Sequence, residues 1–284
     1  MRKEQAEQIA APIIEQLRKG TVPWRKPWSA AGVIPHNYYS TRAYRGINTL
    51  ILGCASLAGG YQSPAWTTYK AAQQHGAQVR KGEKGTQIVF WKPMIAQDKA
   101  TGEDKRILIA RMYTVFNTDQ VDGIDWQMPD RDPVDVPVAL KQIIADYPNP
   151  PAIHHVPQDR AYYQPSTDSI YLPLVEQFNG TQAYAETACH ELVHSTGHPK
   201  RCSRFEENSI GHRSDYAMEE LVAEIGASML MQQAGIDVDV PQIAAYVQSW
   251  LRALEDDHSL IIKAAQRAQK AVDHITGKDS GNDD

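Results

Sequence analysis

Apolar side chains recur along the chain at two different spacings, which predict both helices and strands. From Ile9 to Leu17 the apolar positions fall three or four residues apart, as on one face of a helix. Residues 86–92 and 106–116 are instead dense in β-branched and aromatic side chains, which are typical of strands and predict a hairpin. The pattern therefore favours an α+β fold.

The second half of the chain repeats this mixture. Residues 168–173 alternate in polarity and end in a proline, which predicts an edge strand that can bind an extended peptide by strand addition. A helix is expected to begin at Thr181 or Thr187 and to end near Gly197, because glycine and proline follow there. Another helix is expected where apolar residues return at helical spacing, at Leu221, Val222, Ile225 and Met229.

The first of these two helices carries a motif with chemical meaning. The residues from His190 to His194 read His-Glu-Leu-Val-His, so both histidines lie on one helix face and can hold a single cation. Glu191 then lies beside the cation and can take a proton from a water molecule. Two solvated histidines on a surface helix would give the same five letters, so the motif needs a third ligand to become specific.

Two glutamates on the next helix are candidates for that third ligand. Glu220 and Glu224 lie one turn apart among apolar residues, where a carboxylate is costly unless it is paired or bound to metal. We expect Glu220 to be the ligand and Glu224 to accept a hydrogen bond from a ligand histidine, and the reverse assignment stays open. Glu219 is expected to belong to an exposed acidic face. Two imidazoles and one carboxylate suit Zn²⁺, with another divalent transition metal as the alternative.

Length and composition are those of a globular protein. A chain of 284 residues is long enough for two domains. It contains no run of about 18 apolar residues, so we expect no segment to span a membrane. The 3 cysteines are odd in number and unevenly spaced. They do not suggest a disulfide framework, which favours a cytoplasmic location.

Charge divides the chain into two unlike halves. Residues 1–125 contain 17 Lys and Arg against 10 Asp and Glu, a balance of +7, whereas residues 126–284 contain 12 against 24, a balance of −12. This asymmetry predicts that the first half meets a polyanion. Acidic and turn-forming residues predict a linker at 126–135 between domains at 1–125 and 136–276, and residues 277–284 are expected to form a disordered tail.

Aromatic and basic side chains are interleaved in the first half, which is the combination that single-stranded DNA requires. Cations neutralise phosphates, and each base that stacks on a ring contributes about 1–3 kcal/mol. Core packing of the tryptophans is the competing interpretation. The candidate DNA-binding residues are Trp24, Arg25, Lys26, Trp28, Arg42, Tyr44, Arg45, Arg80, Lys81 and Lys84.

Several segments, taken in order, resemble the ArdC-type antirestriction proteins. They are residues 20–28 (GTVPWRKPW), 44–48 (YRGIN), 79–86 (VRKGEKGT), 113–120 (YTVFNTDQ), 190–198 (HELVHSTGH) and 219–224 (EELVAE). The resemblance covers nearly the whole chain. It implies a small sheet-and-helix domain that binds single-stranded DNA, related to that of TraC-type plasmid primases, followed by a zincin-like metallopeptidase domain. It also implies a plasmid-borne protein that protects entering DNA from restriction.

Two hypotheses follow for the second domain. As a zinc peptidase, it would use Glu191 to move a proton from water to the leaving amine, and Tyr216 or His212, expected in a loop, to donate a hydrogen bond to the oxyanion. Its substrate would be a protein, such as a component of a restriction system. Alternatively, the protein coats single-stranded DNA, and the metal domain is structural or binds a partner without proteolysis.

Overall fold

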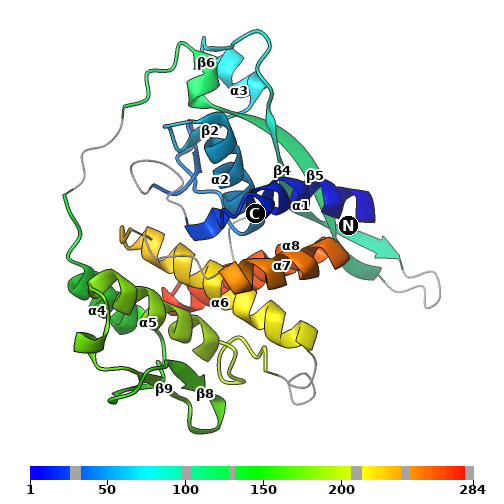
Figure 1. Cartoon of the computed structure of the whole chain (residues 1–284). Coiled ribbons are helices and arrows are strands. Elements are labelled where there is room, and N and C mark those ends of the chain that lie inside the picture. The colour runs from blue at the N-terminus through cyan, green and yellow to red at the C-terminus, as the bar shows by residue number, and fades with distance from the viewer. Residues whose placement is uncertain (26–32, 98–103, 128–131, 206–212, 238–243, 279–284) are drawn as a thin grey trace.

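The structure, a computed structural model, describes residues 1–25, 33–97, 104–127, 132–205, 213–237 and 244–278. Figure 1 shows the N-terminal elements at the top and the sheet of the second half at the bottom, with a layer of helices from both halves between them. The mixture of helices and strands confirms the predicted α+β class.

The first half forms a small sheet with helices on it. Strands β1 (His36–Asn37), β2 (Ala65–Thr67), β5 (Asp104–Asn117) and β4 (Thr86–Gln97) form one sheet in that order. Strands β3 (Gln78–Val79) and β6 (Val121–Asp122) form a second, two-stranded sheet. The helical elements are α1 (Lys3–Arg18), η1 (Pro23–Arg25), α2 (Ile47–Gly59), α3 (Tyr69–Gln74) and η2 (Thr118–Gln120). The predicted N-terminal helix is confirmed by α1.

The β4–β5 hairpin is the longest regular feature of the sheet. Its antiparallel register runs from Thr86 opposite Val115 to Gln97 opposite Asp104, which confirms the predicted hairpin and extends it. At the start of β4, Ile88 and Val89 are buried on opposite faces of the hairpin. Farther out, the two strands leave the body as an arm (Figure 1).

The second half contains three strands and the helices around them. Strand β9 (Ser169–Leu172) lies between β7 (Ala152–His155), to which it is parallel, and β8 (Tyr162–Gln164), to which it is antiparallel. The expected edge strand at 168–173 is therefore wrong, because both sides of β9 are already paired. The helical elements are α4 (Val136–Asp146), η3 (Pro165–Thr167), η4 (Val175–Gln177), α5 (Thr181–Ser195), α6 (Arg213–Gln233), α7 (Ala244–Asp256) and α8 (Ser259–Ile275).

Helices α5 and α6 approach each other closely, and a glycine permits this. Helix α5 begins at Thr181, directly after Gly180, whose φ of 92° favours glycine. On α6, a Cβ placed on Gly226 would lie 2.9 Å from both methyl carbons of Val193. Any larger residue would push the helices apart, so Gly226 sets the separation at which α6 side chains reach the histidines of α5.

One hydrophobic core joins the two halves. It contains Ile13 and Leu17 of α1 together with Leu221 of α6 and Val272 of α8. Polar contacts cross the same boundary: the Arg45 guanidinium lies 2.5 Å from a carboxylate oxygen of Asp273, which is 3% exposed. The two halves are therefore packed as one body.

The segment proposed as a linker, 126–135, precedes α4 in the chain, and its residues 128–131 lie outside the described residues. Its described residues contain no helix or strand. No described helix is long and apolar enough to cross a membrane. All three cysteines are free thiols, and Cys54 and Cys189 are buried. Most of the expected tail, 279–284, lies outside the described residues.

Candidate metal centre

Three side chains predicted to bind metal converge between α5 and α6. The Nε2 atoms of His190 and His194 lie 3.0 Å apart. The carboxylate of Glu220 reaches both: Oε2 is 3.7 Å from Nε2 of His190, and Oε1 is 3.5 Å from Nε2 of His194. The ligand atoms of the three residues all lie within 4.8 Å of one another.

This spacing fits a tetrahedral metal. Ligand atoms about 2.0–2.1 Å from a Zn²⁺ ion lie about 3.3 Å from each other across a tetrahedral edge. The two imidazole nitrogens are 3.0 Å apart, and each lies 3.5 to 3.7 Å from an oxygen of Glu220, His194 from Oε1 and His190 from Oε2. Two imidazole nitrogens and one carboxylate oxygen are also the donors that a catalytic zinc site uses when its fourth position stays open.

Carboxylates contact the other ring nitrogen of each histidine. Glu224 Oε1 lies 3.6 Å from Nδ1 of His190, and Glu219 Oε1 lies 3.2 Å from Nδ1 of His194. Such acceptors fix the ring orientation and the tautomer that presents Nε2 to a metal. Glu224 lies near the ring nitrogen that its predicted role requires, and the role itself stays a prediction. Glu219 does not lie on an exposed face as expected, since its side chain is 17% exposed and reaches into the site.

Carboxylates around His194 favour positive charge at this position. Burial opposes protonation, but hydrogen bonds to Glu219 and Glu220 raise the pKa of His194 to about 10. Burial likewise opposes ionisation of Glu220, whereas hydrogen bonding to His194 holds the pKa of that carboxyl below its usual value. The site thus presents an anionic environment into which a divalent cation fits.

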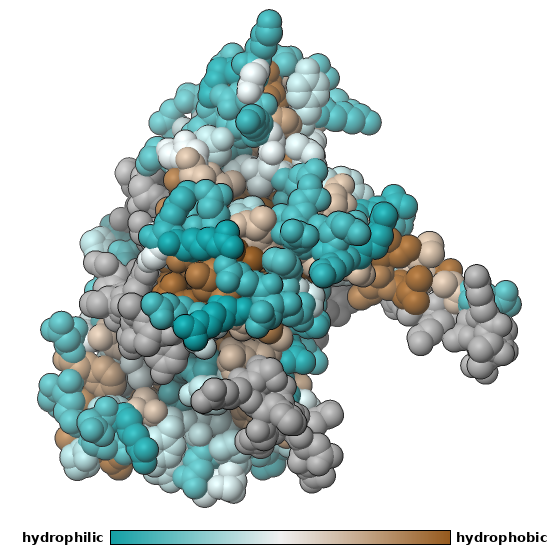
Figure 2. Space-filling view, turned by 45° about the vertical axis from the view of Figure 1, so that its right-hand side comes forward, coloured by the Kyte–Doolittle hydropathy of each residue, from teal (hydrophilic) through white to brown (hydrophobic). Residues whose placement is uncertain are grey.

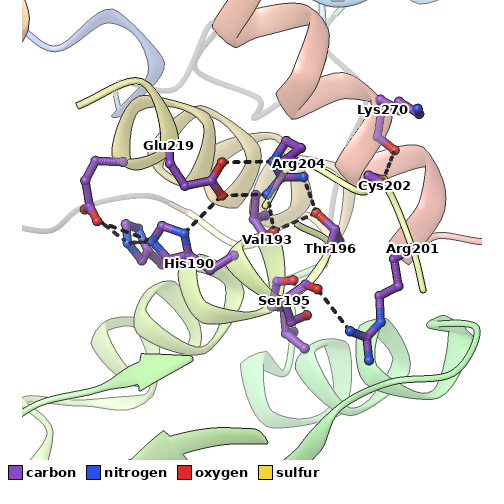
Figure 3. Close-up of polar contacts among 12 residues, drawn as sticks. His190, Val193, Ser195, Thr196, Arg201, Cys202, Arg204, Glu219 and Lys270 are labelled. Carbon is purple, nitrogen blue, oxygen red and sulfur yellow. Dashed lines mark hydrogen bonds and ion pairs between the residues drawn. The ribbon is translucent and has the colours of Figure 1, made fainter. Parts of the chain in front are cut away.

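Arg204 holds Glu219 in place from the loop after α5. Its Nε donates to Oε2 of Glu219 at 2.9 Å and its Nη2 donates to Oε1 at 2.7 Å. The same guanidinium donates to Thr196 Oγ1 at 2.6 Å and to the carbonyl oxygen of Val193 at 2.9 Å (Figure 3). Sequence reasoning missed both Arg204 and Glu219. The one available signal was Glu219 itself, which adjoins Glu220 on an apolar helix.

Glu191, the candidate base, is buried beside the histidines. Its side chain belongs to a residue that is 6% exposed, and it accepts a hydrogen bond from the backbone N–H of Tyr163 in β8. Burial raises the pKa of Glu191 to about 7, with His194 opposing and Glu220 adding to the shift. A carboxyl group in this range can both accept and release a proton near neutral pH.

Tyr216 lies in a helix and not in the predicted loop. It belongs to the first turn of α6, four residues before Glu220, and it hydrogen-bonds the Glu220 side chain. The i to i+4 spacing on one helix face explains this contact. The ring is 65% exposed, so it borders the site from the solvent side. His212, the alternative donor, lies outside the described residues.

Three of the predicted DNA contacts are buried or ion-paired within the protein. Trp24 is 0% exposed and packs edge-on against Trp250 of α7, with ring centroids 5.5 Å apart, so no base can stack on it. Tyr44 is buried in a cluster with Trp66. Arg45 is engaged by Asp273. Core packing, the competing interpretation for the tryptophans, is correct for Trp24, and Tyr44 is buried as well.

The other predicted DNA contacts differ in their surroundings. Arg42, Lys81 and Lys84 are exposed. Arg80 lines a hollow of about 560 Å³ beside α3, but its guanidinium contacts Glu83, Asp122 and the carbonyl oxygen of Asp119. Acidic partners therefore offset its charge. Lys26 and Trp28 lie outside the described residues, as does the side chain of Arg25.

A His-Glu-x-x-His helix packed against a second helix that contributes a glutamate defines a zincin-like domain. Comparison with protein families agrees: a zincin-like metallopeptidase family matches residues 142–267, and the N-terminal domain of the anti-restriction factor ArdC matches residues 3–116. The chain belongs to the ArdC antirestriction protein family. Its fold class and its family are thus those expected from the sequence.

Solved structures and curated sequences support this assignment. The metal-free crystal structure of the antirestriction protein ArdC from plasmid R388 is 42% identical, with a TM-score of 0.80 over 95% of this chain and 96% of that one. Its Mn(II)-bound structure is 39% identical, with the same TM-score of 0.80, over 98% and 99%. The uncharacterised protein y4eC of Sinorhizobium fredii is 34% identical over 96% of this chain and 92% of its own length.

Similarity also extends to larger proteins. A DNA primase TraC of Escherichia coli is 39% identical over 95% of this chain, and a second is 38% identical over the same share. The chain spans only 27% and 20% of the length of these two primases.

Proposed function

We propose that His190, His194 and Glu220 hold a divalent transition metal, with zinc as the expected ion. The observation that carries the proposal is the convergence of their ligand atoms within 4.8 Å. The R388 relative has been solved with Mn(II) bound, so manganese is the first competitor to test. When bound, such a metal supplies a Lewis acid that polarises a carbonyl group and makes water more acidic.

The residues around the metal suit hydrolysis of an amide bond. Glu191 would take a proton from water at its carboxylate and later give it to the leaving nitrogen. Glu219 and Glu224 would hold the two imidazoles in the tautomer that presents Nε2. Tyr216, exposed and bonded to Glu220, lies where its hydroxyl can turn toward a developing oxyanion. The substrate would be a protein.

We further propose that the first half binds single-stranded DNA and that the protein acts in antirestriction, in the cytoplasm. The balance of +7 in residues 1–125 supports binding to a polyanion. The match of residues 3–116 to the N-terminal domain of an anti-restriction factor supports the biological role. In the alternative hypothesis, DNA coating suffices and the metal domain carries out no proteolysis.

Metal analysis of the purified full-length chain tests the metal proposal. We expect about one transition metal ion per chain in the wild type and its loss in His194→Ala. His198→Ala is the matched control, because His198 lies four residues farther on, past the end of α5 at Ser195. Equal metal content in the wild type and His194→Ala would refute the ligand set.

A further inference from the structure

The β4–β5 arm exposes aromatic rings that the hydrophobic core does not use. Phe90 is 47% exposed and Tyr113 is 45% exposed, and their rings meet edge to face with centroids 5.4 Å apart. Phe90 lies opposite Arg111, and Tyr113 lies opposite Ile88, so both rings are on one face of the hairpin. Figure 2 shows the arm projecting from the body with apolar residues gathered along it.

Two cations flank these rings on the same face. Arg111 lies opposite Phe90, and Lys92 follows two residues after Phe90 on the strand. Both are exposed, and neither forms an ion pair within the part of the chain that the structure describes. Strands β4 and β5 contain four basic residues and a single acidic one, Asp104, which is the first residue of β5.

The opposite face of the hairpin has a different character. Near the sheet, Trp91 and Met112 pack against the main core. Farther out, Ile95 is 70% exposed and Leu108 is 59% exposed. On this face the ring of Trp91 packs against the core, whereas Phe90 and Tyr113 are exposed beside Lys92 and Arg111 on the other face.

The hollow beside α3 is the main alternative location for a DNA-binding surface, but its charge is less suitable for a polyanion than that of the hairpin face. It has an aromatic pair, Tyr69 and Phe116, with centroids 6.4 Å apart. However, Glu83 and Asp122 also line it, and both contact Arg80. These two carboxylates offset the two cations of the hollow, Arg80 and Lys81, so a polyanion would meet no net positive charge there.

We propose that the face of the β4–β5 hairpin around Phe90, Lys92, Arg111 and Tyr113 is the surface that binds single-stranded DNA. The inference rests on the proposed DNA-binding function and gives it a location. Bases stack on the exposed rings of Phe90 and Tyr113, while Lys92 and Arg111 contact phosphates on either side. Stacking on rings requires no particular base, so the surface is insensitive to sequence. It takes the place of the buried Trp24 and Tyr44.

The test is a titration of the full-length protein with fluorescent oligothymidylate at several salt concentrations. Phe90→Ala and Tyr113→Ala should each weaken binding about 5- to 150-fold, as expected for the loss of one stacked base. Phe90→Tyr and Tyr113→Phe keep a ring and should restore most of the affinity. Arg111→Gln and Lys92→Gln should each reduce the log–log salt slope by about 0.7.

Matched controls lie elsewhere on the same half. Ile95→Ser and Leu108→Ser change exposed apolar residues on the opposite face of the hairpin and should leave DNA affinity unchanged. If Tyr69→Ala weakens binding while Phe90→Ala and Tyr113→Ala do not, the site lies beside α3 and this inference is wrong. The inference is also wrong if the wild type and the ring variants bind blunt duplex DNA as tightly as single strands. A duplex offers no free base faces, so equal affinity would mean that stacking on the rings does not contribute.

Failure of this inference is distinguishable from failure of the proposed function. If the wild type does not bind oligothymidylate at low salt, the DNA-binding function itself is refuted. If the wild type binds and the two ring variants bind equally well, with folded state confirmed by thermal melting, only the location is refuted.

Discussion

Arg204 and Glu219 form a bidentate ion pair, in which Nε donates to Oε2 at 2.9 Å and Nη2 donates to Oε1 at 2.7 Å. Because Oε1 of Glu219 also lies 3.2 Å from Nδ1 of His194, the pair links a loop residue to a candidate metal ligand. The side chain of Arg204 is only 6% exposed. The loop after α5 therefore controls how one imidazole is oriented.

Replacing Arg204 should affect both stability and metal binding. Arg204→Gln leaves the Glu219 carboxylate buried without its cation, which should lower the free energy of unfolding by about 3–5 kcal/mol. Metal affinity should fall about 10- to 100-fold, because His194 loses its fixed orientation. Arg204→Lys should not rescue either property, since an ammonium group cannot form both hydrogen bonds. Competition with a chelating dye measures the affinity, and unchanged affinity would contradict the role assigned to the pair.

Glu220 and Glu224 lie one turn apart on α6, and their alanine variants should differ in metal binding. Glu220→Ala should abolish metal binding, since it removes one of three protein ligands. Glu224→Ala should keep the metal with about 10- to 100-fold weaker affinity, because it removes only the acceptor for His190 Nδ1. Elemental analysis after dialysis against a weak chelator makes the comparison. The opposite ranking would identify Glu224 as the ligand.

Glu191→Gln should separate chemistry from metal binding. The amide keeps the shape of the side chain and is not a ligand, so metal content and fold should match the wild type. Any peptide hydrolysis should be lost, because water has no proton acceptor. We expect the variant still to protect DNA entering a restricting host, since coating a strand needs no proteolysis. A transfer assay in which protection disappears while affinity for single-stranded DNA is retained would make proteolysis the operative activity.

Alanine variants of Trp24 and Tyr113 should have opposite effects on stability and DNA affinity. Trp24→Ala empties a buried position against Trp250, so the free energy of unfolding should fall by about 3–5 kcal/mol. The affinity of the folded protein for single-stranded DNA should not change. Tyr113→Ala should keep the stability and lose affinity. Thermal melting and a DNA titration on the same samples provide the comparison, and a Trp24 variant that melts normally but fails to bind DNA would restore the original stacking hypothesis.

The chain should unfold in one transition, because its two halves share a core. Arg45→Ala should lower the free energy of unfolding by about 1–3 kcal/mol, since it leaves the buried Asp273 without its cation, and partial exposure of Arg45 limits the effect. Residues 1–125 expressed alone should bind an apolar dye. Two separate melting transitions in the intact protein would show that the halves fold independently.

Local patterns in the sequence were sufficient for the metal ligands and for the helices that carry them. His190 and His194 are four residues apart on one helix, and Glu220 lies on an apolar helix close behind, so helical periodicity alone indicates their common face. Glu219 was misjudged because its partner Arg204 belongs to a loop, and no periodicity connects a loop residue to a helix.

Long-range pairing accounts for the other errors. The proline after residue 172 suggested an edge strand, but the position of β9 depends on two partners, β7 and β8, that a local pattern does not reveal. The surroundings of Trp24 are basic in sequence, yet its ring packs against Trp250, more than two hundred residues away. Phe90 and Tyr113 were not singled out because each strand alone resembles an ordinary half-buried strand.

The hydrophobic core shared by the two halves has a consequence for truncated gene products. A gene fragment that encoded only one half would produce a polypeptide with a bare apolar surface, which invites aggregation. We therefore expect a stable product only when both halves are encoded together. The two Escherichia coli primases align with 95% of this chain while the chain fills no more than 27% of either primase. The two halves thus align together in both primases, which agrees with their shared core.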